Sequence, residues 1–221
     1  MRVEIWSDVA CPWCYIGKRR FEKALERFEH RDEVEVVWRS FELDPGAPAE
    51  PERDLAQALA RKYGSTVEQV HARWESMAAM AAEDGLDMRF HDVRRGNTFD
   101  AHRLTHLAAA RGLADPMVER LFRAHHSEGL LLSDHAVLER LAVETGLPRD
   151  EAAEMLAGDR FDAEVRDDER TAASLGIGAV PFFVIDRAMG ASGAHPPEVL
   201  LQLLNRGWTA RADQPAPASR P

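Results

Sequence analysis

A chain of 221 residues with 45% hydrophobic and 30% charged residues is ordinary for a folded globular protein and long enough for a sizeable core. Its formal net charge of −10, without a long basic run, argues against a nucleic-acid partner. No segment approaches the roughly 20 apolar residues of a membrane-spanning helix, so no membrane partner is expected. The N-terminus enters a strand directly, without the apolar core of a signal peptide, which favours a cytoplasmic protein.

The first forty-odd residues predict one β-α-β unit. Residues 2–7 read as a short buried strand, and residues 15–28 place their apolar side chains on one face of a helix. Residues 33–41 alternate apolar and polar side chains, which is typical of a half-buried strand. A right-handed crossover makes these two strands parallel.

The segment 43–48, Leu-Asp-Pro-Gly-Ala-Pro, breaks this unit, and the sequence beyond it is helical. A capping-box pattern at Ser65-Thr66-Val67-Glu68 opens a long helix that is closed by Gly85. Shorter helices, most of them closed by a glycine, are predicted over residues 98–111, 117–126, 134–145, 149–156 and 161–175.

Strand character returns after Gly176, with predicted strands at 182–186 and 189–192 and a last helix at 197–206. The order β-α-β, helical block, β-β-α predicts an α/β protein, a thioredoxin fold with a large all-helical insertion. The Ala/Pro/Arg-rich end lacks apolar periodicity and is predicted to be disordered. The expected parts are a thioredoxin-fold N-terminal part at 1–44, a helical insertion domain at 45–176, a thioredoxin-fold C-terminal part at 177–208 and a disordered tail at 209–221.

The only two cysteines, Cys11 and Cys14, are two residues apart, between the first strand and the first helix. In a reducing cytosol such a pair is more often catalytic or metal-binding than a structural disulfide. Cys11 would lie at the helix start, where free N–H groups and the helix dipole favour a thiolate, and Pro12 suits the first helical position. Cys14 would lie one turn further in, behind Trp13. We therefore expect Cys11 to attack a substrate disulfide and Cys14 to resolve the mixed disulfide.

Asp8, three residues before Cys11, opposes this effect, because an acidic neighbour raises the pKa of a thiol. The sequence leaves the redox potential of the pair open. We expect a pKa of Cys11 below the free-thiol value of about 8.5, and far less lowering at Cys14.

A zinc site is the main alternative use of a CxxC pair. Zinc needs four ligands, and no spacing among the nine histidines pairs sensibly with the single CxxC, so no metal is expected. His102 and His106, four residues apart on one predicted helix, are more often a polar stripe than a metal site.

Val180-Pro181 heads the apolar run of the third predicted strand. A proline forfeits a ladder hydrogen bond, so it belongs at the first residue of a strand. Placed opposite the CxxC pair, it matches the cis-proline loop of thioredoxin folds, which leaves the Val180 backbone free to pair with an extended substrate. An ordinary trans turn proline is the alternative, and the CxxC pair favours cis.

Four sequence blocks in order carry a resemblance to a known family: residues 7–14 (Ser-Asp-Val-Ala-Cys-Pro-Trp-Cys), 97–102 (Asn-Thr-Phe-Asp-Ala-His), 178–183 (Gly-Ala-Val-Pro-Phe-Phe) and 192–194 (Ser-Gly-Ala). Over most of residues 1–208 the chain resembles the DsbA family of thioredoxin-fold oxidoreductases, specifically its cytoplasmic FrnE-like branch. The resemblance implies disulfide oxidoreductase or isomerase activity, with Cys11 and Cys14 as the redox pair. It also implies that the helix end at Asn97, first of all an N-cap, faces the active site. The substrate-binding residues then expected are Pro12, Trp13, Val180, Pro181, Asn97 and His102.

The same superfamily includes kappa-class glutathione transferases and 2-hydroxychromene-2-carboxylate isomerases. These usually carry a serine where this chain has Cys11, and hold glutathione partly through an acidic residue near the position of Ala194. Both positions depart from that pattern, which favours redox chemistry over glutathione transfer.

The favoured hypothesis is a cytoplasmic protein disulfide oxidoreductase or isomerase, with the helical block as a lid over the active site. Its partners would be protein or small-molecule thiols and disulfides. No cofactor is expected beyond the redox-active disulfide Cys11–Cys14, with glutathione as an alternative partner. The alternatives are a glutathione-dependent transferase or isomerase on the same fold, and a chaperone-like binding module for which Cys11 is dispensable.

Overall fold

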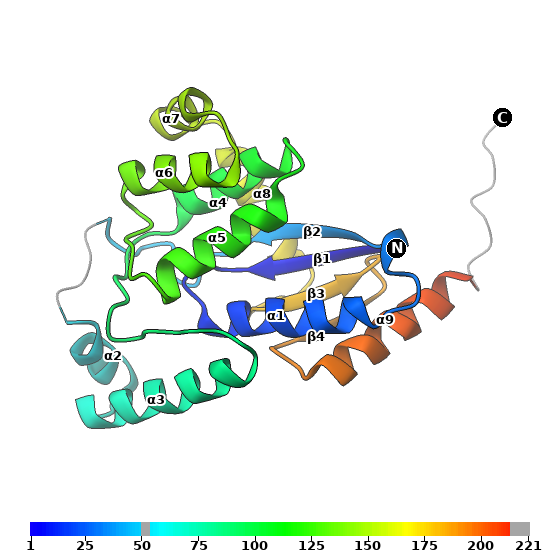
Figure 1. Ribbon diagram of the computed structural model, residues 1–221, viewed down its shortest axis with the longest axis horizontal. Coiled ribbons are helices and arrows are strands. Elements are labelled where there is room, and N and C mark those ends of the chain that lie inside the picture. Colours follow the sequence, from blue (N-terminus) through cyan, green and yellow to red (C-terminus); the bar gives the residue numbers. More distant parts are fainter. Residues whose placement is uncertain (50–53, 213–221) are drawn as a thin grey trace.

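A computed structural model describes residues 1–49 and 54–212 and shows one mixed sheet surrounded by helices (Figure 1). The four strands lie in the order β2-β1-β3-β4, with β1 parallel to β2, β3 antiparallel to β1, and β4 antiparallel to β3. Their bounds are Arg2–Ser7 for β1, Glu35–Ser40 for β2, Phe182–Ile185 for β3 and Met189–Ser192 for β4. This topology, with a helical insertion between β2 and β3, is the predicted thioredoxin fold.

Strand β1 lies inside the sheet, and five of its six residues are buried. Glu4 is among them, because its carboxylate accepts hydrogen bonds from the guanidinium groups of Arg39 and Arg187. A buried carboxylate is tolerated when it is paired in this way.

One face of the sheet is covered by α1 (Pro12–Glu26) and α9 (Pro197–Ala212), which pack against each other. Phe183 of β3 stacks on Phe21 of α1, with ring centroids 5.5 Å apart. The other face packs against the insertion, where the indole of Trp6 donates a hydrogen bond to the Asp168 carbonyl at 3.0 Å. The sheet thus lies between a layer formed by α1 and α9 and a layer formed by the inserted helices. The C-terminal end of β1 lies between these two layers.

The insertion contains helices with the bounds α2 Leu55–Tyr63, α3 Val67–Glu83, α4 Phe99–Ala109, α5 Ala114–His126, α6 His135–Thr145, α7 Arg149–Ala157 and α8 Asp162–Ser174. Helices α4 to α7 enclose an apolar core of their own, which includes Leu104, Leu121 and Leu141. The α2–α3 hairpin instead packs against the main core through Val70 and Trp74, and stands apart from α4–α8 in Figure 1. Among the described residues, every helix is too short or too polar to cross a membrane.

The helices differ from the sequence prediction in several places. Helix α2 was not predicted; it begins after Asp54, whose side chain accepts a hydrogen bond from the Gln57 N–H. The capping box of α3 is formed by Thr66 and Gln69, not by Ser65 and Glu68. Helix α9 continues to Ala212, so residues 209–212, predicted as the start of a disordered tail, are helical. Residues 213–221 lie outside the described residues.

Candidate active site

The two cysteines lie at the start of α1, as the sequence predicts. Cys11 is the N-cap residue with an extended backbone (φ −89°, ψ 114°), and Pro12 occupies the first helical position. Proline costs nothing there, because the N–H that it lacks would have no partner within the helix. Cys11 N–H donates to the Asp8 carbonyl and Cys14 N–H donates to the Cys11 carbonyl, both at 3.0 Å. These bonds fix Cys11 at the helix entrance and Cys14 inside the first turn.

The two thiols come within 3.6 Å of each other and have opposite electrostatic environments. A hydrogen bond from the Cys14 thiol, aided by the backbone N–H groups of Cys14 and Trp13, lowers the pKa of Cys11. Burial and the negative charge of Asp8 act in the opposite direction without reversing the shift. Burial raises the pKa of Cys14 well above its usual range, and the bond that it donates to Cys11 raises it further. The lower pKa of Cys11 agrees with the prediction, whereas for Cys14 only a weaker lowering was expected and burial instead raises its pKa.

The Val180-Pro181 bond is cis, which confirms the prediction for this loop. The Val180 carbonyl points at the CxxC pair and accepts a hydrogen bond from Cys11 Sγ at 3.7 Å. Pro181 packs on α1: a Cβ added at Gly17 would lie 2.8 Å from its ring. Glycine at position 17 therefore permits the close approach of the proline loop to the CxxC helix.

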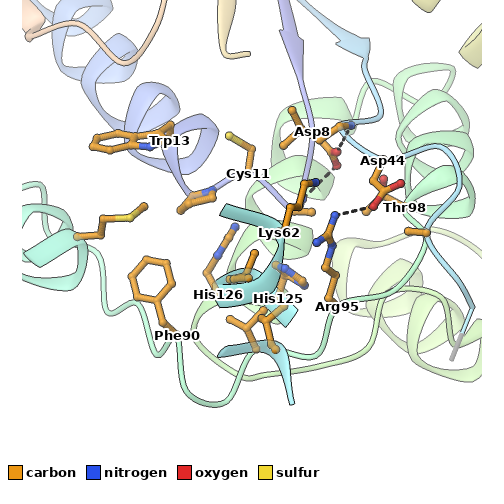
Figure 2. A pocket seen from close by; sticks show the side chains of 18 of the residues that line it. Asp8, Cys11, Trp13, Asp44, Lys62, Phe90, Arg95, Thr98, His125 and His126 are labelled. Atoms are coloured by element: carbon orange, nitrogen blue, oxygen red, sulfur yellow. Dashed lines mark hydrogen bonds and ion pairs between the residues drawn. The ribbon is translucent and has the colours of Figure 1, made fainter. Parts of the chain in front are cut away.

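Cys11 opens into a cavity of about 500 Å³ between the start of α1 and the α2–α3 hairpin (Figure 2). Volumes of this order are typical of small-molecule sites. Trp13, 38% exposed, lies at the cavity beside Cys11, and Val180 closes the wall on the sheet side. The wall formed by the hairpin and the segment after it is largely apolar, with side chains of Leu55, Leu59, Val70, Trp74, Met77 and Phe90.

The charged groups around the cavity divide into paired and unpaired ones. Arg95 donates to the Asp44 carboxylate at 2.7 Å, and Asp8 is paired with a histidine described below. Lys62 of α2 and Arg73 of α3 are exposed, and neither has an ion-pair partner among the described residues. Lys62 lies over the ring of its neighbour Tyr63 at 5.8 Å. The cavity lining therefore carries two positive charges that no residue of the described part of the chain pairs.

His125 and His126, at the end of α5, complete the polar part of the wall (Figure 2). His126 Nε2 lies 3.1 Å from the Val9 carbonyl, and because a carbonyl only accepts, this nitrogen carries the proton. Burial lowers the pKa of His125 to about 4, and burial with the neighbouring His125 lowers that of His126 well below its usual value. Both side chains are therefore neutral at pH 7.

The predicted substrate-binding residues separate into two groups. Pro12, Trp13 and Val180 line the cavity together with Cys11, whereas Pro181 lies behind it. The other candidates come from the start of α4 and do not line the cavity.

Asn97 precedes Thr98, the N-cap residue of α4, and its side-chain oxygen accepts from the Phe99 N–H at 2.8 Å. His102 is 3% exposed, and its Nε2 lies 3.6 Å from Asp8 Oδ1. The start of α4 lies near the candidate active site, as expected. His102, however, faces Asp8 and does not line the cavity.

The comparisons with known proteins agree with this geometry. Residues 2–205 match the family model described as the DSBA-like thioredoxin domain. A crystal structure of a probable DsbA oxidoreductase from Streptomyces coelicolor is 47% identical, covers 99% of this chain and 94% of that one, and superposes with a TM-score of 0.94.

Two more distant structures show likeness of fold alone. A 2-hydroxychromene-2-carboxylate isomerase is 14% identical with a TM-score of 0.73, over 98% of this chain and 100% of that chain. The cytosolic disulfide reductase DsbM from Pseudomonas aeruginosa, in a structure with GSH, is 18% identical with a TM-score of 0.63, over 95% and 100% of the two chains. With the family model spanning almost the whole described chain and a CxxC pair at the start of α1, the protein belongs to the DSBA-like thioredoxin domain family.

Proposed function

We propose that the protein is a thiol–disulfide oxidoreductase in which Cys11 is the attacking thiol. The observation that carries this proposal is the asymmetry of the pair: the pKa of Cys11 is lowered and that of Cys14 is raised. Cys11 also lines the cavity, whereas Cys14 is 1% exposed inside the helix. A thiolate that a substrate can reach, next to a protected thiol, suits two-step exchange.

The reaction balances with two electrons. The Cys11 thiolate attacks one sulfur of a substrate disulfide, forms a Cys11–substrate disulfide and releases the other substrate half as a thiolate. Cys14, after losing its proton, attacks Cys11 Sγ and releases the second substrate thiolate. The Cys11–Cys14 dithiol is oxidised to a disulfide and the substrate is reduced to two thiols. The reverse sequence oxidises a substrate dithiol.

The cavity supports a small disulfide or thiol as one substrate class. It lies against the α2–α3 hairpin, it is largely apolar, and its lining includes Lys62 and Arg73, which have no ion-pair partner among residues 1–49 and 54–212. An apolar body with one or more carboxylates would fit these walls, and Trp13, Pro12 and Val180 would hold it against Cys11. Glutathione satisfies the carboxylate requirement, and a cytoplasmic location, where small thiols are abundant, is part of this proposal.

A glutathione-dependent isomerase or transferase is the second candidate, favoured by the fold shared with the 2-hydroxychromene-2-carboxylate isomerase. Such a reaction would use one thiol-binding site and no second cysteine. The presence of Cys14 within reach of Cys11 favours redox exchange over this alternative.

The test is reduction of insulin by dithiothreitol, followed by turbidity, with wild-type protein and with Cys11→Ser. We expect acceleration by the wild type and none by Cys11→Ser. Acceleration that survives Cys11→Ser would overturn the proposal. Glutathione-dependent isomerisation that needs Cys11 but not Cys14, in a protein without insulin or small-disulfide exchange, would support the second candidate instead.

A further inference from the structure

A buried ion pair lies directly behind the attacking thiol. Asp8 is 1% exposed, and its Oδ1 faces His102 Nε2 at 3.6 Å. The same carboxylate accepts hydrogen bonds from the N–H of Ala10 at 3.1 Å and of Leu43 at 2.8 Å. Its backbone carbonyl accepts from Cys11 N–H. The carboxylate is therefore held in one place, next to the loop that presents Cys11.

The other charged groups around His102 come from two further segments. Glu42, which follows β2, has a fully buried side chain and accepts from Arg166 of α8 at 2.6 Å. Glu169, also on α8, pairs with the same guanidinium at 2.7 Å. Both carboxylates act on His102 in the same direction as Asp8, so the acidic neighbours outweigh burial and raise the pKa of His102.

The charges around Asp8 are fewer. His102 is its facing cation, and His125 of α5 is near enough to feel its charge but is neutral at pH 7. Burial disfavours the carboxylate, but His102 and the two backbone N–H groups outweigh it and lower the pKa of Asp8. The surroundings therefore favour the anionic form of Asp8 and the cationic form of His102, and both side chains are buried.

An unbalanced carboxylate at this position would oppose ionisation of Cys11, because charges in a buried region are weakly screened. We propose that His102 is a positioning residue for Cys11: its imidazolium balances Asp8, so that the helix entrance can hold a thiolate. The inference rests on the proposed function, since it needs Cys11 to be the attacking thiol. It also separates the role of His102 from substrate binding, because His102 does not line the cavity.

The arrangement has a consequence for the pH profile. As the pH rises and His102 loses its proton, the Asp8 charge is no longer balanced and further ionisation of Cys11 becomes harder. The titration of Cys11 is therefore broader than that of a single independent group. Replacing His102 with glutamine should raise the pKa of Cys11 and narrow its profile.

The experiment measures the rate of iodoacetamide alkylation against pH in the reduced Cys14→Ser protein, in which Cys11 is the sole thiol. The added substitutions are Asp8→Asn, His102→Gln and both together. His106→Gln is the matched control: His106 lies one turn further along α4 and pairs with Asp168 at 3.1 Å, away from Cys11. Thermal unfolding of each variant checks that it is folded.

We expect His102→Gln to slow alkylation at pH 7 by about tenfold, equivalent to a rise of about one unit in the pKa of Cys11. Asp8→Asn should speed alkylation, and in its background His102→Gln should have little effect. His106→Gln should leave the profile unchanged. Equal shifts from His102→Gln and His106→Gln, or the same His102→Gln shift with and without Asp8, would overturn the inference.

Two results keep this inference distinct from the proposed function. Insulin reduction that survives Cys11→Ser defeats the proposed function, whatever the alkylation profiles show. Insulin reduction that depends on Cys11, together with an unchanged profile in folded His102→Gln, defeats the inference alone. If His102→Gln does not fold, the profiles of the Cys14→Ser protein with and without Asp8→Asn decide: a broad profile that narrows on removing Asp8 supports the pairing, and identical widths overturn it.

Discussion

At the scale of single residues, two identical thiols in this site differ in their environment. Cys11 and Cys14 are separated by one helical turn and share a hydrogen bond, yet only Cys11 lines the cavity. Burial disfavours a thiolate at Cys14 far more strongly than at Cys11, where helix N–H groups compensate. Position along α1 therefore distinguishes the two thiols, without any basic residue inside the motif, as the proposed roles require.

This asymmetry predicts different behaviour for the two serine variants. Cys14→Ser should accumulate a mixed disulfide between Cys11 and its partners, because the thiol that releases the substrate is missing. Non-reducing gels of Cys14→Ser protein from cells should show ladders that collapse on reduction. Cys11→Ser is the control and should show none. Equal trapping by both variants would contradict the assignment of attacking and resolving thiols.

The buried histidines predict how stability depends on pH. In the unfolded chain His125 has an ordinary pKa near 6.5, whereas in the folded protein burial lowers it to about 4. Between these two pH values the unfolded state binds more protons at His125 than the folded state does. The full stability of the fold is therefore present above pH 6.5 and is lost as the pH falls. From pH 7 to pH 5 this one group should remove about 2 kcal/mol of the free energy of unfolding.

Urea unfolding at pH 7 and pH 5 measures this effect. His125→Gln should reduce the loss of stability between the two pH values by about 2 kcal/mol, because glutamine does not titrate. His91→Gln, at an exposed histidine, is the control and should leave the loss unchanged. An identical pH dependence in wild type and His125→Gln would show that His125 is not held in its neutral form.

At the scale of secondary-structure elements, the site depends on how closely α1 approaches the proline loop. Gly17 lies where the helix meets Pro181, and an added Cβ would lie 2.8 Å from the proline Cγ and 3.6 Å from the Ala194 Cβ. The first distance is too short for a real contact, so a larger residue must displace the loop that carries Val180. The glycine therefore links the packing of the helix to the position of the carbonyl facing Cys11.

We expect Gly17→Ala to lower the free energy of unfolding by about 1–3 kcal/mol through overpacking, and to lower kcat/KM for disulfide exchange as well. Gly207→Ala is a matched control: Gly207 lies on α9, and an added Cβ would lie 2.7 Å from Ile185, at the other end of β3. That variant should lose stability but keep its kcat/KM at a temperature where it is folded. If both variants lose activity only in proportion to stability, the proline loop is not displaced in Gly17→Ala.

The sequence predicted correctly the elements whose own pattern of apolar and polar residues identifies them. Strand β1, the CxxC helix, most of the inserted helices and the Val180-Pro181 strand were all placed from local pattern. Helix α2 was missed because it follows a breaker segment and buries only small residues, Ala56 and Ala60. The end of α9 was missed because alanine and arginine at positions 210–212 read equally well as a tail or as a last helical turn.

The place of the CxxC pair at the start of α1 could be predicted from sequence, but its surroundings could not. Cys11 and Cys14 are adjacent in the chain, so their chemistry is local. Trp74 and Phe90 reach the cavity only because the α2–α3 hairpin folds back over α1, which no local pattern records. For the same reason, the pairing of His102 with Asp8 could not be predicted, since the two residues are 94 positions apart in sequence and meet only through the packing of α4.

At the scale of the whole molecule, the charge distribution is uneven in a way that bears on substrates. The chain has a formal net charge of −10, so an anionic small molecule is repelled by the protein as a whole. Arg73 and Lys62 nevertheless stand unpaired among the described residues at the cavity mouth, on the hairpin that closes the cavity. A locally positive entrance on an acidic protein favours anionic over cationic substrates at this one place.

This contrast predicts selectivity between disulfides of similar size and opposite charge. Dithiodipropionate is dianionic and cystamine is dicationic at pH 7, and we expect the wild type to show the lower KM for dithiodipropionate. Because an exposed ion pair contributes about 0.2–1 kcal/mol, removing both cations with Lys62→Gln and Arg73→Gln should raise that KM about 2- to 30-fold and leave kcat nearly unchanged. The difference in KM between dithiodipropionate and cystamine should also become smaller at high salt.

The control for this prediction removes two positive charges elsewhere, at Arg140 on α6 and Arg149 on α7, which are exposed and lie outside the cavity lining. Arg140→Gln with Arg149→Gln changes the net charge of the protein by the same amount, so it reports the effect of overall charge alone. A KM for dithiodipropionate that rises equally in the two double variants would mean that net charge sets the selectivity. If the KM for dithiodipropionate rises only in Lys62→Gln with Arg73→Gln, while the KM for cystamine falls or does not change, the hairpin sets the selectivity. The α2–α3 hairpin would then both enclose the substrate and select its charge, while α1 supplies the thiol that reacts with it.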